Sequence, residues 1–141
     1  MSVSIREQLL QAIADRVGAT RALPSYSQKD LPLTVLVDGA EESTPNSYGM
    51  ESVQMEAVLA RIVAANTTKE DWRTEANEQM AQMIVSAFAG DDTFGGLAEG
   101  MDYAGGSVEE IQDGARGYIV TIALIVRYTF LHGNPFLQYE D

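Results

Sequence analysis

The sequence predicts an α+β fold in which two helices cover one face of a mainly antiparallel sheet, in the order α-β-β-α-β-β. Residues 4–18 and 67–90 have an apolar residue every three or four positions, which indicates amphipathic helices. Alternating or β-branched apolar residues indicate strands in four other segments, 33–40, 51–63, 100–111 and 118–130. Because we find no internal repeat, linker or low-complexity tract, we expect one domain over residues 1–141.

The first helix carries a signal at each end. Ser4 followed by Glu7 has the spacing of a capping box, and Gly18 stands where a helix would stop. Between them the main apolar stripe consists of Ile5, Leu9, Leu10, Ile13 and Val17. After a turn-rich connector, LTVLVDGA predicts a short strand, and EESTPNSYG predicts an acidic polar loop. In the strand, one side would carry Leu33, Val35 and Val37.

The segment from 51 to 63 is compatible with a strand or a helix. A strand would carry on one face Val53, Met55, Ala57, Leu59 and Arg61. A helix would have only a thin stripe, made of Val53, Ala57, Ala60 and Ala64, although the composition favours helix. We favour the strand, because it would pair with Leu33–Val37 across the acidic loop.

The second helix begins in NTTKEDW, with Thr67 or Thr68 as its N-cap. Glu70 and Asp71 in the first turn favour a helix start through the helix dipole, and Gly90 marks the end. Its apolar stripe consists of Trp72, Ala76, Met80, Met83, Ile84, Ala87 and Phe88. For Trp72 and the methionines we favour core packing over a recognition groove.

The most apolar stretch lies near the C-terminus. Its run from 118 to 126 is much shorter than the roughly 20 residues that a membrane-spanning helix needs, and its β-branched composition predicts a strand. One face is large and apolar and should lie in the core: Tyr118, Val120, Ile122, Leu124, Val126, Tyr128 and Phe130. The other face is mixed and should be half covered: Ile119, Thr121, Ala123, Ile125, Arg127 and Thr129. The Asp-Gly pair in 112–117 predicts a tight turn from a preceding strand, in which Gly105-Gly106 indicates a bulge.

The chain is strongly acidic, with 21 Asp and Glu against nine Lys and Arg and a formal net charge of −12. The segments 38–60 and 90–115 contain twelve of these acids and no base. Such a surface repels a nucleic-acid backbone, so we expect no specific DNA or RNA binding; solubility is the ordinary explanation for the charge. With no cysteine, the chain has no disulfide, thiol catalysis or cysteine-bound zinc. The N-terminus lacks the pattern of a signal peptide, so we expect none.

No pattern of catalytic residues stands out. His132, the only histidine, lies in a polar turn and is expected to be an exposed turn residue. The sequence AGGSVE lacks the spacing of a nucleophile elbow, and there is no phosphate-binding or dinucleotide-binding loop. We therefore predict no catalytic residue, no cofactor and no dedicated metal site, although weak divalent-ion binding between subunits stays open. A chain without such a site is expected to act through its surfaces.

Four segments, in this order and spacing, resemble those of the tail terminators of tailed bacteriophages. These minor tail proteins cap the tail tube. The segments are the opening helix IREQLLQAIADRV, the strand and loop LPLTVLVDGAEES, the stretch AGDDTFGGLAEGM after the second helix, and the closing strand YIVTIALIVRYTF with NPF nearby. The likeness covers nearly the whole chain.

The resemblance implies a non-enzymatic structural protein with helices packed on a sheet. Its subunits would form a hexameric ring on the last ring of the tail tube protein, end tube polymerisation and present a surface to the head–tail connector protein. The location would be the head-proximal end of the virion tail, and the host cytoplasm during assembly. Genome DNA would pass through the central hole. The resemblance carries over no binding residues.

Two sets of residues are candidates for this assembly. Acids that would line the lumen and repel DNA phosphates are Asp38, Glu41, Glu42, Asp91, Asp92 and Asp113. Residues for a subunit or tail interface, on the far face of strand 118–130, are Ile119, Thr121, Ile125 and Arg127. We expect that strand and the ends of both hairpins to offer exposed pairing edges, and assembly to depend on salt or divalent ions.

Three alternatives stay open. One is another head–tail joining or neck component of a virion. A second is a small-molecule-binding or enzymatic α+β domain that uses its acidic loops. The third is a dimeric interaction module.

Overall fold

The computed structural model has the predicted α+β architecture and the predicted order of elements. It describes residues 3–22, 30–64, 72–111 and 117–138. The helices are α1 (Ile5–Val17) and α2 (Trp72–Ala87), and the strands are β1 (Leu33–Pro45), β2 (Met50–Ala64), β3 (Gly100–Glu110) and β4 (Gly117–Leu131).

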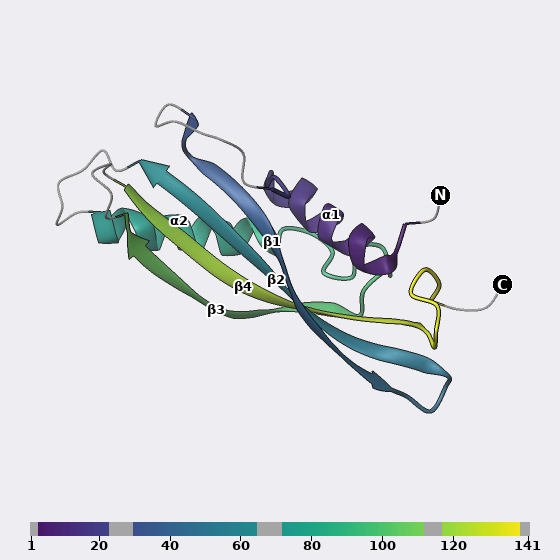
Figure 1. Ribbon diagram of the computed structural model, residues 1–141. Helices are drawn as coiled ribbons and strands as arrows, with labels where there is room; N and C mark the ends of the chain where they lie inside the picture. The colour runs from purple at the N-terminus through teal and green to yellow at the C-terminus, as the bar shows by residue number, and fades with distance from the viewer. Residues whose placement is uncertain (1–2, 23–29, 65–71, 112–116, 139–141) are drawn as a thin grey trace.

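The four strands form one antiparallel sheet in the order β1-β2-β4-β3. Figure 1 shows a long, twisted sheet, with α2 behind the strands and the β1–β2 hairpin reaching beyond both helices at one end. Segment 51–63 is a strand, as favoured. The expectation that strand 118–130 offers a pairing edge is wrong, because β4 is bonded to β2 on one side and to β3 on the other. Its apolar residues on both faces suit this central position, and β1 and β3 form the edges.

The core lies between the two helices and one face of the sheet. The predicted core face of β4 is confirmed, since six of its side chains are at most 2% exposed: Tyr118, Val120, Ile122, Leu124, Val126 and Tyr128. The Trp72 ring stacks on that of Tyr118, with 6.1 Å between the centroids. Met83 is buried, and Met80 packs against the same cluster. Core packing of Trp72 and the methionines is therefore confirmed.

Helix α1 begins and ends at the predicted residues. Ser4 Oγ accepts a hydrogen bond from the Glu7 backbone N–H at 3.1 Å, and Gly18 ends the helix in the left-handed conformation, with φ of 70°. The capping box is only half formed, because the Glu7 carboxylate instead accepts two hydrogen bonds from Arg21. The predicted caps and first-turn acids of the second helix, at 67–71, lie outside the described residues.

Strand β1 differs from prediction in length and in its buried face. The predicted loop at 41–49 is wrong, because residues 41–45 continue β1 and the turn is limited to Asn46–Gly49, where Asn46 Oδ1 accepts from the Tyr48 N–H. The core residue is Leu36, which is fully buried opposite Leu59. The predicted side, with Leu33, Val35 and Val37, faces away from the helices.

Both edge strands contain a β-bulge. The register of β3 shifts between Tyr103 and Gly105, which confirms the predicted bulge, and Gly105 has a φ of 118°. A second bulge, in β1 between Asp38 and Glu41, was not predicted. The predicted Asp-Gly turn falls on 112–116, outside the described residues.

Candidate assembly surface

The sheet has an outer face, which is the face turned away from both helices. The pairing registers give its residues, because side chains that are paired across strands share a face. From one end of the sheet to the other, the rows are Leu33–Ile62–Ile119–Glu109, Val35–Ala60–Thr121–Ser107, Val37–Val58–Ala123–Gly105, Glu56–Ile125–Asp102, Glu42–Gln54–Arg127–Gly100 and Thr44–Ser52–Thr129.

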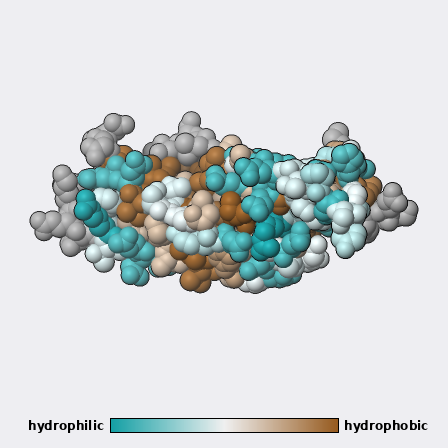
Figure 2. Space-filling view, turned by 90° about the horizontal axis from the view of Figure 1, so that it is seen from below, coloured by the Kyte–Doolittle hydropathy of each residue, from teal (hydrophilic) through white to brown (hydrophobic). Residues whose placement is uncertain are grey.

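The first three rows form an apolar patch on β1, β2 and β4. We define the apolar patch as Leu33, Val35, Val37, Val58, Ala60, Ile62, Ile119 and Ala123. Val37 is 49% exposed, Val35 and Ile62 are buried at 6% each, and the others are half-buried. Exposed hydrophobic side chains are also visible among hydrophilic ones in the space-filling view from below (Figure 2). An apolar patch on a sheet face that no helix covers is typical of a surface that binds another molecule.

Acidic side chains border the apolar patch. Glu109 ends its first row on β3, and Glu56 and Asp102 stand in the row that follows its third. All three are exposed. The apolar patch therefore has an acidic border, made of Glu109 on its β3 side and of Glu56 and Asp102 in the row beyond it.

The four predicted interface residues all lie on the outer face. Ile119, Thr121, Ile125 and Arg127 alternate along β4, and each is half-buried. The structure thus brings the whole set together in one line, beside the apolar residues of β2.

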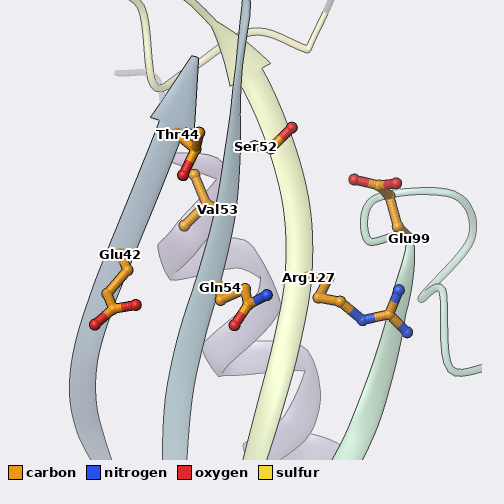
Figure 3. A pocket seen from close by; sticks show the side chains of 7 residues that line it. All are labelled: Glu42, Thr44, Ser52, Val53, Gln54, Glu99 and Arg127. Atoms are coloured by element: carbon orange, nitrogen blue, oxygen red, sulfur yellow. The ribbon is translucent and has the colours of Figure 1, made fainter. Parts of the chain in front are cut away.

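A shallow polar hollow of about 320 Å³ lies at the other end of the outer face. In Figure 3 the residues around it come from β1, β2, β4 and the segment before β3, and a helix lies behind the strands. It is lined by Glu42, Thr44, Ser52, Val53, Gln54, Glu99 and Arg127. Arg127 Nε donates to Asp102 Oδ2 at 3.2 Å, and the guanidinium passes over Gly100, where a Cβ would stand 2.6 Å from its Nη2. Both partners of this ion pair are well exposed, so it contributes at most about 1 kcal/mol.

Two of the predicted lumen acids turn instead toward α1. Arg21 bridges Glu7 on α1 (2.7 Å) and Asp38 on β1 (2.9 Å). Hydrogen bonding to Glu7 and then to Asp38 raises the pKa of Arg21, against the opposing effect of burial. Asp38 therefore serves as a link between the sheet and the helix.

Glu41 makes a similar link. It accepts from Arg6 of α1 at 2.7 Å and from the Tyr128 hydroxyl at 3.0 Å. Burial, followed by the nearby Glu41 carboxylate, raises the pKa of Tyr128. Two partners thus hold Glu41 on the helix side of the sheet.

The Asp-Asp-Thr-Phe-Gly-Gly stretch folds into a closed loop after α2. The Asp91 carboxylate accepts from the Thr93 N–H (2.9 Å), the Thr93 hydroxyl (2.7 Å) and the Gly95 N–H (3.0 Å). Arg16 of α1 donates to the Asp91 carbonyl at 2.6 Å and lies 4.1 Å from the centroid of the Phe94 ring. These contacts explain the stretch as a structural element that fastens the loop to α1.

The Asp91 contacts predict an acid-sensitive contribution to stability. The hydrogen bonds from Thr93 and then Gly95 lower the pKa of Asp91 to about 2 from its usual 3.8. A carboxyl whose pKa is lowered by folding stabilises the native state above its unfolded pKa, and this contribution is lost as pH falls from about 4 towards 2. We expect Asp91→Asn to reduce the steepness of stability loss in that range, measured from urea midpoints at several pH values. Asp15→Asn, on the exposed side of α1, is the control, and an unchanged pH profile in Asp91→Asn would contradict the assignment.

The six predicted lumen acids do not form one surface. Asp38 and Glu41 face α1, Glu42 lines the hollow on the outer face, and Asp91 and Asp92 belong to the loop after α2. Asp92 has a buried carboxylate oxygen without a hydrogen-bond partner in the described residues. Asp113 lies outside the described residues.

His132 is an exposed turn residue, as predicted, with a side chain that is 77% exposed. Its Nδ1 lies 2.9 Å from Glu51 Oε2, a contact that was not predicted. Hydrogen bonding to His132 and then to Ser43 lowers the pKa of Glu51. Within the described residues, no group of three His, Asp or Glu side chains is placed to hold a metal ion, and no helix is long and apolar enough to cross a membrane.

Sequence reasoning missed the acidic border and the β1 and β2 parts of the apolar patch. Glu56, Asp102 and Glu109 are separated in sequence. They lie on one face around the apolar patch only because β4 pairs with both β2 and β3. The alternation in each strand was a usable signal, but combining the strands into one face required the sheet order.

Comparisons with known proteins find similarity among solved structures. No family model matches the chain, and no curated protein matches it. Among solved structures, a chain described as "Virion of native gene transfer agent (GTA) particle" is similar over 89% of this chain and 92% of that chain, with a TM-score of 0.44 and 14% sequence identity.

Proposed function

We propose that this protein is a structural component of a phage-like virion and acts as a tail terminator. Its subunits close into a ring, of six by the resemblance, on the end of the tail tube. The ring ends tube polymerisation and offers its free side to the head–tail connector protein. We assign it no catalytic role. The order and spacing of the four resembling segments support this proposal.

The outer face is the observation that carries an assembly role. It combines an apolar patch with all four predicted interface residues on one uncovered side of a sheet. An antiparallel sheet that is open to water on one side normally presents polar side chains there. Leu33, Val37, Val58, Ile119 and Ile125 break that pattern, so covering them by another protein would be favourable, at about 25 cal/mol for each Å² of apolar surface removed from water.

We propose that the ring has an acidic lumen, lined by fewer of the predicted acids. Asp38 and Glu41 are paired with Arg21 and Arg6, so their charges are compensated within the subunit. The carboxylates of Glu42 and Glu99 have no hydrogen bond or ion pair in the described residues, and both residues line the hollow. A ring that turns such carboxylates toward its hole would let DNA pass without binding it.

Ring formation is tested by native mass. Because each subunit carries a net charge of −12, subunits repel one another, and we expect light scattering to show a larger ring fraction at about 0.5 M than at about 0.05 M salt, or with Mg²⁺ added. Negative-stain images of the largest species should show a ring of six with an open centre. A dimer of fixed mass at every protein and salt concentration would contradict the ring and favour the dimeric interaction module.

A further inference from the structure

We infer that the outer face binds a different protein, one whose contact surface is apolar at its centre and bordered by Lys and Arg, and not a second copy of this chain. This inference deepens the proposed assembly role, on which it rests for the class of partner. It assigns the outer face to the contact with another virion protein and leaves ring closure to other surfaces of the subunit.

Carboxylates of the acidic border are free to pair with cations of another molecule. The carboxylates of Glu56 and Glu109 make no hydrogen bond or ion pair within the described residues, and both residues are exposed. Arg127 is the cation that the described chain places on the outer face, and it is already bonded to Asp102. Among the described residues, the carboxylates beside the apolar patch are therefore not compensated by a free cation.

The other arginines that the structure describes already have partners within the subunit. Arg6 and Arg21 bind carboxylates that link β1 to α1, and Arg16 binds two backbone carbonyls. Arg61 donates to a threonine hydroxyl and a glutamine side chain beneath α2, and burial lowers its pKa. Arg73 lies over the Trp72 ring, with 5.4 Å to the centroid. These arginines are committed to the fold and are poor partners for a second molecule.

The outer face could bind either a second copy of this chain or a different protein. A second copy packed face to face would bring Glu56 and Glu109 against an identical acidic border, and like charges across an interface oppose association. A surface with Lys and Arg around an apolar centre would pair with the same carboxylates while covering the same apolar residues. Charge complementarity therefore favours a basic-bordered partner over self-association.

The experiment uses two strand-forming peptides as probes, one of alternating Lys and Val and one of alternating Glu and Val. Binding to the ¹⁵N-labelled full chain is followed by amide chemical shifts. We expect the Lys–Val peptide to shift signals from the outer-face residues of β1, β2 and β4, and the Glu–Val peptide to leave them unchanged. In Glu56→Lys/Glu109→Lys, the dissociation constant for the Lys–Val peptide should rise about tenfold or more.

A matched control separates this site from general attraction to an acidic protein. Asp15→Lys/Glu78→Lys makes the same change in net charge on exposed residues of α1 and α2, and it should raise the dissociation constant much less. Equal weakening in both double variants, or binding of the Glu–Val peptide, would overturn the inference.

A second measurement tests self-association through this face. Val37→Glu adds a charge at an exposed position of an edge strand, so the fold should tolerate it. We expect the mass distribution of the pure protein to be the same as that of the wild type. If Val37→Glu dissociates a ring or dimer, the outer face binds a second copy and the inference is wrong. The proposal that the wild type forms a ring would not be affected. If no ring forms in any condition but the peptide result holds, the proposed terminator role fails and the surface assignment survives.

Discussion

Leu124→Ala should lower the free energy of unfolding by about 2–5 kcal/mol, whereas Ile125→Ala, at the next position, should lower it by about 1 kcal/mol. Leu124 is fully buried on β4, with Ala57 and Tyr103 as its cross-strand neighbours, and shortening its side chain leaves a cavity under the helices. Ile125 lies on the outer face and is half-buried, so its truncation removes less buried surface.

Urea unfolding of both variants and the wild type measures this contrast. Two adjacent residues of equal size in one strand act as controls for each other, because they share the backbone environment and differ in the face they occupy. Equal losses of stability would mean that the outer face is covered as fully as the core. That result would contradict both the two-face description of the sheet and the assembly surface built on it.

The faces of β2 and β4 could be predicted because their periodicity is strong. Every second residue from Tyr118 to Tyr128 is large and apolar, and a period of two places such residues on one side of a strand. The ends of α1 were predictable for a local reason as well, since capping by Ser4 and termination at Gly18 depend on neighbouring residues alone.

The face of β1 could not be predicted in the same way. Leu33, Val35 and Val37 alternate as a core face would, yet Leu36 is the residue that meets the helices. Since residues 33–37 place large apolar side chains on both faces, with Leu36 opposite to the other three, period alone does not distinguish the two faces. The decision is made by pairing with β2, where Leu36 stands opposite Leu59.

The acidic candidates failed to form one surface for a related reason. Local charge imbalance shows that a segment is acidic, but it says nothing about cations that the fold brings from elsewhere. Arg6 on α1 and Arg21 in the segment after α1 are far in sequence from Glu41 and Asp38, and the fold brings each arginine to its carboxylate. The interface candidates fared better, because they were chosen by alternation along a single strand.

Gly39→Ala should destabilise the protein by about 1–3 kcal/mol through overpacking at the β1 bulge. A Cβ at Gly39 would meet the backbone carbonyl of Glu56 and stand 2.7 Å from the Glu56 Cβ. The β2 backbone is paired on its other side with β4, so it cannot retreat. Ala40→Ser, at the exposed neighbouring position, should change stability by less than about 0.5 kcal/mol and is the control. Unchanged stability in Gly39→Ala would contradict the close approach.

This bulge also decides which acids reach the outer face. Before it Asp38 pairs with Ala57, and after it Glu41 pairs with Met55, so one extra residue turns Glu41 toward α1 and Glu42 toward the hollow. A variant that relieves the clash by losing the bulge would reverse the two, since a one-residue slip exchanges the faces. The nuclear Overhauser contact between Glu41 and Met55 would then be replaced by one between Ala40 and Met55. Because Glu41 would take the place of Glu42 on the outer face, the number of carboxylates there would stay the same, and the dissociation constant for the Lys–Val peptide should not change.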